Sequence, residues 1–340
     1  MTTLNYQSGA ARRARLGDTL VRLALQREWG VALLLALTVA AVTLVNHSFL
    51  SAGNVRDMLV NNANYAIIAC GVTFVIVTGE IDISVGSLAG LLAVVLGLLT
   101  APEHGHMAVA PAVAITLALG LAVGLVNGFL VAYARVPSII VTLGMLTALR
   151  GVTKKIIGDE WIDVVPGLRL FGTGRIGGID IAVLVAAAVI VASMLLAART
   201  PLGRRIYAVG SNPHAARLAG LSPRRIKLFV FALTGLLVGV AVLVDTTRLP
   251  KIESDYGTGW ELFIVTAVIV GGTSISGGKG TIIGSILAVL LLGSIRSVLI
   301  FLKLGLNATY WERAIQGGFF LLAVLADHLA RGGHGAEDHS

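Results

Sequence analysis

The chain has 340 residues and carries 26 Lys and Arg against 18 Asp and Glu, which gives a net charge of +8 at pH 7. Hydrophobic residues make up 56% of it and charged residues only 13%, whereas a soluble domain carries about 25% charged residues. This composition excludes a soluble enzyme, a disordered scaffold and a typical nucleic-acid-binding protein, so we expect no nucleic acid among its partners. It favours a polytopic α-helical membrane protein. The one cysteine, Cys70, lies in an apolar run and excludes a disulfide framework.

Apolar segments recur along the chain at close to the length that a membrane helix needs, roughly 20 residues for a bilayer core about 30 Å thick. The expected fold is all-α, a membrane helical bundle of about ten transmembrane helices with two related repeats. Residues 1–28 form a basic arm with five Arg, 29–328 form the transmembrane domain, and 329–340 form a disordered tail. The ten predicted segments are 29–45, 65–78, 83–100, 108–134, 138–157, 179–198, 228–244, 261–272, 281–300 and 310–326.

The long loop 199–227 indicates how the chain is oriented. It contains seven Arg or Lys and no Asp or Glu, so the positive-inside rule places it in the cytoplasm. The Arg-rich arm belongs on the same side, and we expect the first apolar segment to be retained rather than cleaved. Six segments precede the loop and four follow it, which puts both termini in the cytoplasm.

Two segments of the chain resemble each other. Residues 73–79 (TFVIVTG) match residues 266–272 (TAVIVGG) at five of seven positions, with an offset of 193. In each copy an apolar run is followed by a Gly/Ser/Thr-rich break and then by a second apolar run. Six segments separate the copies, so we predict that they run parallel, although transporter halves are often inverted instead.

The two polar breaks, residues 78–87 and 271–280, are the predicted substrate pathway. Short, Gly-interrupted segments in corresponding parts of two halves indicate a transport site, because carbonyls and amides freed from the helix can line a polar cavity. The carboxylates of Glu80 and Asp82 would each cost roughly 2.5–3.5 kcal/mol at the bilayer centre, so they belong at the interface or in a wet pathway. The alternative is that both breaks are plain cytoplasmic turns. The candidate pathway residues are Thr78, Gly79, Glu80, Asp82, Ser84, Gly86, Ser87, Gly271, Gly272, Thr273, Ser274, Ser276 and Gly277.

No catalytic set, metal site or cofactor site is expected in this chain. Residues 277–280 (GGKG) resemble the end of a phosphate-binding loop, but Thr273 stands at the position of its first Gly and Gly280 replaces its Ser or Thr. We therefore expect a transport subunit without its own ATP site. An ion- or proton-coupled carrier or channel, with Glu80 and Asp82 as its relay, is the alternative from another class.

Within the basic loop, residues 212–220 predict one short, well-capped helix. Asn212 suits the N-cap, Pro213 the first helical position, and Gly220 a left-handed stop. Such a helix outside the membrane suits docking to a partner's groove, and a basic face against anionic lipid is the other interpretation. The candidate coupling residues are Gly210, Asn212, Pro213, Ala215, Ala216, Arg217 and Gly220.

Five ordered blocks resemble the permease subunits of ribose/xylose-type ABC sugar importers: 78–87 (TGEIDISVGS), 126–131 (VNGFLV), 136–144 (VPSIIVTLG), 203–213 (GRRIYAVGSNP) and 271–280 (GGTSISGGKG). The resemblance covers about residues 30–328. It implies a bacterial inner-membrane permease that pairs with a second permease subunit as a homo- or heterodimer. It also implies a periplasmic sugar-binding protein that delivers the sugar and a separate cytoplasmic ATPase that docks on the basic loop.

Family members carry ribose, xylose, galactose, rhamnose or the furanosyl autoinducer, and the resemblance does not name the sugar of this chain. The sequences at residues 161–162 and 321–327 resemble the rhamnose and autoinducer branch of the family more than its other branches. One departure concerns residues 263–266 (FIVT), where the family usually has a charged or polar residue followed by small ones. The bulk there is expected to reshape the pathway.

Overall fold

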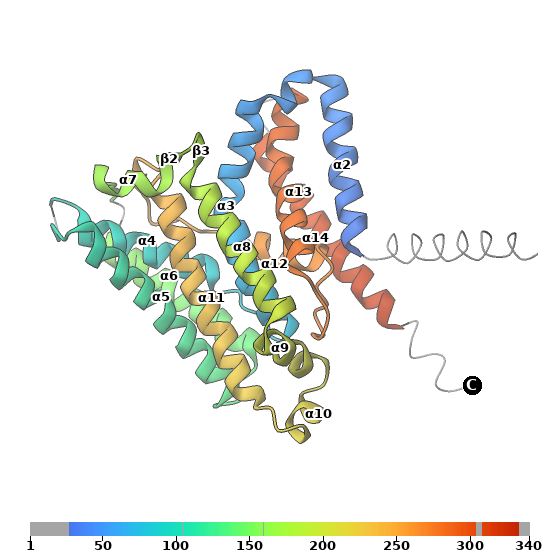
Figure 1. The fold of residues 1–340 in the computed structure, drawn as a ribbon. Helices are drawn as coiled ribbons and strands as arrows, with labels where there is room; N and C mark the ends of the chain where they lie inside the picture. Colours follow the sequence, from blue (N-terminus) through green and yellow to red (C-terminus); the bar gives the residue numbers. More distant parts are fainter. Residues whose placement is uncertain (1–26, 104, 159, 304–307, 333–340) are drawn as a thin grey trace, which may run out of the picture.

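A computed structural model of the chain describes residues 27–103, 105–158, 160–303 and 308–332, and these form a bundle of helices (Figure 1). The long elements are α2 (Arg27–Val45), α3 (Ala52–Val77), α4 (Val85–Thr100), α5 (Val109–Ala132), α6 (Ser138–Ile157), α8 (Ile181–Arg199), α11 (Pro223–Thr246), α12 (Trp260–Val270), α13 (Ile282–Phe301) and α14 (Ala308–Gly332). The short elements are η1 (His47–Leu50), α7 (Pro166–Thr173), α9 (Pro201–Ser211), α10 (Pro213–Leu218) and four two-residue strands. These strands pair antiparallel, β1 (Ile162–Asp163) with β4 (Lys251–Ile252) and β2 (Arg175–Ile176) with β3 (Ile179–Asp180).

The all-α prediction is confirmed, and each of the ten predicted apolar segments forms a helix. In the described part of the chain six helices are long and apolar enough to cross a membrane, namely α2, α3, α5, α8, α11 and α13. Helices α4 and α12 are apolar but shorter, with 16 and 11 residues. At a rise of about 1.5 Å per residue, α12 extends only about 16 Å.

Several helices extend beyond the predicted segments, α3 and α14 by the most. Helix α3 begins at Ala52 rather than at residue 65. Its first half is polar, so hydropathy alone did not predict it as part of the helix. Ser51 caps this half by accepting a hydrogen bond from the Asn54 amide at 3.4 Å. Helix α14 continues to Gly332, so residues 329–332 are helical where we expected a disordered tail. The rest of that tail, 333–340, and residues 1–26 of the basic arm lie outside the described residues.

Helix α3 forms the centre of the bundle, and α8, α11, α12 and α13 pack around it (Figure 1). Its middle is fully buried: Ile67, Ile68, Cys70, Val72 and Phe74 are each 0% exposed. Because this stretch contacts protein on every side, its apolar character comes from the protein core rather than from contact with lipid.

Glycines allow α5 and α11 to pack closely. A Cβ atom at Gly120 would lie 2.5 Å from the carbonyl oxygen of Gly235, and one at Gly124 would lie 3.0 Å from the Ala232 Cα atom. Gly120, Gly124 and Gly128 recur every fourth residue, so they share one helix face and let the two backbones meet. A side chain at any of these positions would push α5 away from α11.

Candidate functional site

The two breaks lie side by side in the structure, at the ends of two parallel helices. The Tyr65 ring on α3 contacts the Trp260 ring at the start of α12, with 5.2 Å between centroids. At the other end of both helices, the Gly278 amide donates to the Val77 carbonyl oxygen at 2.8 Å. Helices α3 and α12 therefore run in the same direction, as the parallel repeat predicts.

The first break is held by buried polar contacts. The Asp82 side chain, 3% exposed, accepts hydrogen bonds from the Ser84 amide at 2.9 Å and the Ser84 hydroxyl at 2.6 Å. Asn127 of α5 donates to Ser84 Oγ at 3.0 Å, and the Ser87 hydroxyl donates to the Ser84 carbonyl at 2.9 Å. Asp82 thus has a hydrogen-bonded, structural place in the break.

The first break also runs alongside α12. Thr78 caps the end of α3, and Gly79 continues the chain in the left-handed region at φ 79°. At the far end of the break, a Cβ atom at Gly86 would lie 2.5 Å from the Gly257 carbonyl oxygen and would also meet Glu261 in the first turn of α12. The break therefore extends along almost the full length of this short helix.

Glu80 has a different partner from Asp82. Its carboxylate forms an ion pair with Lys227 in the second turn of α11. The two carboxylates have separate partners, an arrangement that does not favour the proton or ion relay considered as the alternative.

The second break is a tight turn. The Gly277 amide donates to the Ser274 carbonyl at 2.9 Å, and the Ser274 amide donates to the Lys279 carbonyl at 2.9 Å. Gly272 and Gly277 have φ values of 95° and 85°, conformations that residues with a Cβ atom rarely adopt. Ser276 is exposed and Thr273 is 0% exposed.

The second break also packs against α13. A Cβ atom at Gly271 would lie 2.6 Å from the Ser285 amide nitrogen of that helix. Both breaks are thus compact and packed, and among the candidate pathway residues Glu80 is the one that lines a cavity described below.

Helix α9 contacts the second break and the end of α3, where the first break begins. The Tyr207 hydroxyl donates to the Gly280 carbonyl at 2.7 Å. A Cβ atom at Gly210 would overlap the Val77 carbonyl oxygen and lie 2.8 Å from the Gly278 amide nitrogen. Gly210 is therefore the point where the basic segment meets the ends of both repeats.

The predicted short helix is confirmed as α10, and a further helix that was not predicted, α9, precedes it within the segment 199–227. The Asn212 side chain accepts hydrogen bonds from the amides of His214 at 3.0 Å and Ala215 at 2.9 Å, which is the predicted N-cap. Gly220 has φ 79°, which is the predicted left-handed stop. Ala216 is 5% exposed and anchors the helix, whereas Ala215 and Arg217 are exposed.

A basic cavity of about 470 Å³ opens beside α10, and it was not predicted from the sequence. It lies at the start of α11, next to the first break and the α5–α6 turn. Its lining residues are Glu80, Val131, Ala132, Arg135, Val136, Pro137, Pro213, Arg217, Pro223, Arg224 and Lys227.

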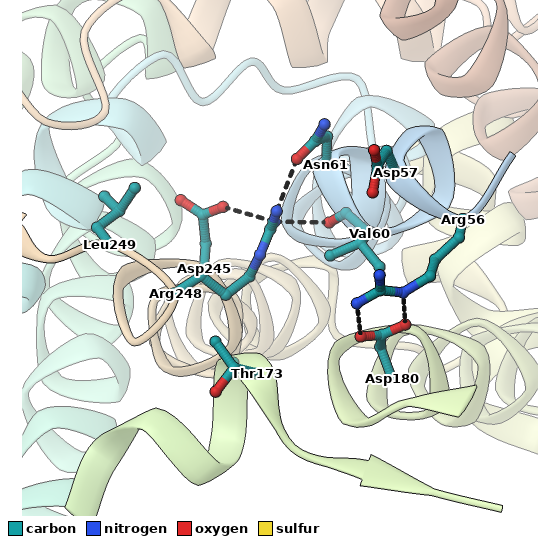
Figure 2. Close-up of a pocket in the computed structure, with 10 residues that line it drawn as sticks. Arg56, Asp57, Val60, Asn61, Thr173, Asp180, Asp245, Arg248 and Leu249 are labelled. Atoms are coloured by element: carbon teal, nitrogen blue, oxygen red, sulfur yellow. Dashed lines mark hydrogen bonds and ion pairs between the residues drawn. The ribbon is translucent and has the colours of Figure 1, made fainter. Parts of the chain in front are cut away.

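A mixed-charge cavity of about 360 Å³ lies at the opposite end of α11 (Figure 2). Arg56 binds Asp180 through two hydrogen bonds, each 2.7 Å long. Arg248 donates to the Val60 carbonyl at 3.0 Å and to the Asn61 side chain at 2.7 Å. The lining residues are Arg56, Asp57, Val60, Asn61, Gly172, Thr173, Asp180, Asp245, Arg248 and Leu249.

Charges in the mixed-charge cavity are largely neutralised by one another. Asp180 is 3% exposed and precedes α8 as its N-cap residue, where hydrogen bonding to the Arg56 guanidinium holds its pKa below the ordinary value. Asp245 lies 3.7 Å from Arg248 and accepts a hydrogen bond from the Tyr256 hydroxyl at 2.7 Å. Sequence reasoning missed this cavity because Arg56 and Asp180 are 124 positions apart, and their only signal was charge at the ends of apolar segments.

Phe263, the residue at which the chain departs from the family pattern, belongs to an aromatic cluster. Its ring lies 4.4 Å from the Tyr65 ring, and the Trp260 ring lies 4.9 Å from that of Tyr256. The added bulk therefore packs against α3 at the start of α12.

The parallel repeats, the packed breaks and the capped α10 are features of a permease component of a transport system. The protein-family profile described as "Branched-chain amino acid transport system / permease component" matches residues 54–324. The chain belongs to this family. It is a multi-pass membrane protein and a transport component.

Similar proteins with assigned functions agree with this membership. The chain is 36% identical over 304 residues to the "Ribose import permease protein RbsC" of Escherichia coli (strain K12), covering 86% of this chain and 91% of that protein. It is 36% identical to the protein of the same name from Bacillus subtilis (strain 168), covering 86% and 90%. It is 34% identical to the "Autoinducer 2 import system permease protein LsrC" of Yersinia pseudotuberculosis, covering 87% and 83%.

Proposed function

We propose that this chain is the permease subunit of an ATP-binding-cassette importer that moves a neutral simple sugar, such as a pentose or deoxyhexose, into the cytoplasm. The names of its relatives support a small carbohydrate-like substrate rather than an amino acid. The single observation that carries the proposal is the contact of α9 with the second break and with the end of α3 that leads into the first, through Gly210 and Tyr207.

In this proposal α10 is the docking element for a separate cytoplasmic ATPase. Its exposed side chains, Ala215, Arg217 and the 79%-exposed Leu218, are available to a partner, while Ala216 ties the helix to the bundle. Movement of α10 passes to α9, which directly precedes it and is joined to it at Asn212, and from α9 to the ends of α3 and α12. The chain itself supplies no ATP site, in keeping with the close packing of the glycine turn at residues 277–280 against Val77 and Ser211.

The two breaks line the sugar pathway, which is completed by a second permease subunit, identical or related. Two buried oxygens near the breaks support a polar path: Thr273 Oγ1 and Asn127 Oδ1 have no hydrogen-bond partner among the described residues. Buried polar atoms of this kind are rare and usually have a purpose, here contact with sugar hydroxyls when the breaks separate.

The orientation follows from charge. Helices α9 and α10 and the start of α11 face the cytoplasm with their cluster of Arg and Lys, and both termini lie on that side of the inner membrane. The mixed-charge cavity then faces the periplasm, where a sugar-binding protein delivers its load. A neutral polyol suits a cavity in which Arg and Asp side chains already neutralise one another.

Transport by reconstituted vesicles tests the proposal. The chain would be co-expressed with its ATPase and candidate partner permease, and uptake of radiolabelled ribose, xylose and rhamnose would be measured with the binding protein outside. We expect uptake that requires ATP inside and the binding protein outside. Uptake that persists without the ATPase but is abolished by Asp82→Asn would instead establish the ion-coupled carrier and refute the proposal.

A further inference from the structure

The basic cavity beside α10 carries more positive charge than its neighbours neutralise. Four cationic side chains line it, those of Arg135, Arg217, Arg224 and Lys227, against the single carboxylate of Glu80. Glu80 pairs with Lys227, and among the described residues the three Arg side chains form no ion pair. The lining therefore has a net charge of +3.

Backbone groups add to this positive potential. Helices α6 and α11 both begin at the cavity wall, at Pro137 and Pro223. Neither N-cap residue, Pro137 for α6 or Ser222 for α11, accepts a hydrogen bond from a first-turn amide through its side chain, so the first turns of both helices have no side-chain cap. Free amides and the helix dipole favour an anion at such a place, most strongly a phosphate.

Arg135 has an unusual conformation in the turn between α5 and α6. It has φ 61°, in the left-handed region that non-glycine residues seldom adopt, and its side chain is exposed. The turn is closed around it by the hydrogen bond from the Val136 amide to the Leu130 carbonyl at 3.1 Å. Glycine or Asn would fit this backbone with less strain, so the presence of Arg points to a use for its side chain.

Exposed apolar side chains lie on both sides of the Arg135 turn in the chain. Phe129 is 56% exposed and stacks on Tyr133 with ring centroids 5.6 Å apart, just before the Arg135 turn. Just after the turn, Ile139 and Ile140 are 52% and 61% exposed. An apolar surface next to a phosphate-binding pocket matches the two parts of a phospholipid.

We infer that the basic cavity binds the phosphate group of an anionic phospholipid from the cytoplasmic leaflet, with the acyl chains against Phe129, Tyr133, Ile139 and Ile140. The inference rests on the proposed orientation of the chain. Because Pro213 and Arg217 of α10 also line the cavity, the bound lipid contacts the docking helix. The anionic-lipid content of the membrane then affects how strongly ATP hydrolysis is coupled to transport.

The test is lipid binding by the purified full chain, which requires no transport activity. Delipidated protein in detergent would be titrated with phosphatidylglycerol or phosphatidylcholine, and the bound lipid counted by native mass spectrometry. The double variant Arg135→Gln/Arg224→Gln removes two cavity cations. The control Arg204→Gln/Arg225→Gln removes the same charge from exposed positions outside the cavity lining, one of them adjacent to Arg224.

We expect wild type and control to prefer phosphatidylglycerol, and the cavity variant to lose about thirtyfold in affinity for it, at roughly fivefold per cation. Arg135→Lys/Arg224→Lys should retain most of the affinity, which separates loss of charge from loss of fold. Equal losses in the cavity variant and the control would overturn the inference. The inference would also be overturned if inorganic phosphate displaced the bound lipid as effectively as phosphatidylglycerol does, because the site would then be one for free phosphate. It would likewise be overturned if docking of the ATPase expelled the lipid, because the cavity would then be part of the ATPase interface. Failure of this test leaves the transport assay above unaffected.

Discussion

The two cavities at the ends of α11 are similar in size but differ in how far the charges that line them neutralise one another. In the mixed-charge cavity Asp180 and Asp245 each have a cationic partner, and with Asp57 the lining carries two Arg against three Asp, a net charge of only −1. In the basic cavity one carboxylate, Glu80, faces four cations. The difference separates two tasks: a neutralised surface suits a neutral, hydroxyl-rich solute, whereas an excess of cations suits a fixed anionic partner.

The cavities also differ in their connection to the two breaks. Helix α9 lies at the same end of α11 as the basic cavity and contacts the second break and the end of α3. The mixed-charge cavity is built from the far ends of α3 and α11 and the α7–α8 connection. Events at α10 therefore reach the pathway by direct contact, whereas events in the mixed-charge cavity reach it through the length of α3 and α11.

The largest effect that we predict tests this direct contact. Gly210→Ala places a Cβ atom against the backbone of Val77 and Gly278, and backbone on both sides leaves no side chain that can move away. Sugar uptake should fall by more than about tenfold, while membrane insertion is retained. The matched control is Gly144→Ala, since a Cβ atom there would have nothing within 4 Å. Normal uptake in Gly210→Ala would show that α9 does not transmit motion to the breaks.

The next prediction concerns the mixed-charge cavity. Asp180→Asn removes the two-hydrogen-bond pair with Arg56, and the unfolding temperature in detergent should fall by about 2–4 °C. Because pairing lowers the pKa of Asp180 in the folded state, its contribution is complete above the unfolded pKa, about 3.9, and is lost as the pH falls through the folded pKa. The difference between wild type and variant should therefore shrink below about pH 4. Asp57→Asn, which lines the same cavity without an ion pair among the described residues, should not show this pattern.

A smaller effect is expected for the single ion pair of the basic cavity. Glu80→Gln and Lys227→Gln should each destabilise the protein, and the double variant should lose less than the sum, with a coupling energy of about 1 kcal/mol. Denaturant-induced unfolding of the four proteins measures this energy. Strict additivity of the two destabilisations would mean that Glu80 does not neutralise Lys227. All four cations of the basic cavity would then be without a partner, and the two cavities would differ even more.

The smallest effect is local to α10. Asn212→Ala removes the N-cap of that helix and should lower its stability by about 1 kcal/mol, seen as faster hydrogen exchange of the α10 amides. Ser222→Ala is the matched control, because the Ser222 side chain makes no capping hydrogen bond at the start of α11. Equal changes in both variants would contradict the assigned role of Asn212.

Local sequence signals predicted local structure well. The capped α10 depends on residues a few positions apart, where helix geometry alone decides the outcome. The parallel direction of the repeat was predicted from two similar local runs and a count of the apolar segments between them. Helix α3 shows the limit, because its polar first half reads as a loop by hydropathy but is helical through its Ser51 cap and its contacts.

Pairings between distant segments could not be predicted in the same way. Glu80 was expected on the pathway together with Asp82, yet its partner is Lys227, which is 147 positions away. Nothing in either local sequence specifies that pair, because it depends on how α11 crosses the first break. The same applies to Arg56 with Asp180, and to the basic cavity, which gathers side chains from four separate segments.

The burial of Cys70 has a practical consequence. It is the only cysteine in the chain and is 0% exposed at the centre of α3, so thiol reagents have no accessible native target in the folded protein. A cysteine introduced at Asn61 or at Arg225, exposed positions near opposite ends of the bundle, would therefore be labelled without a background signal. A membrane-impermeant maleimide applied to intact spheroplasts should modify the first variant and not the second, which would directly determine how the molecule faces the two compartments.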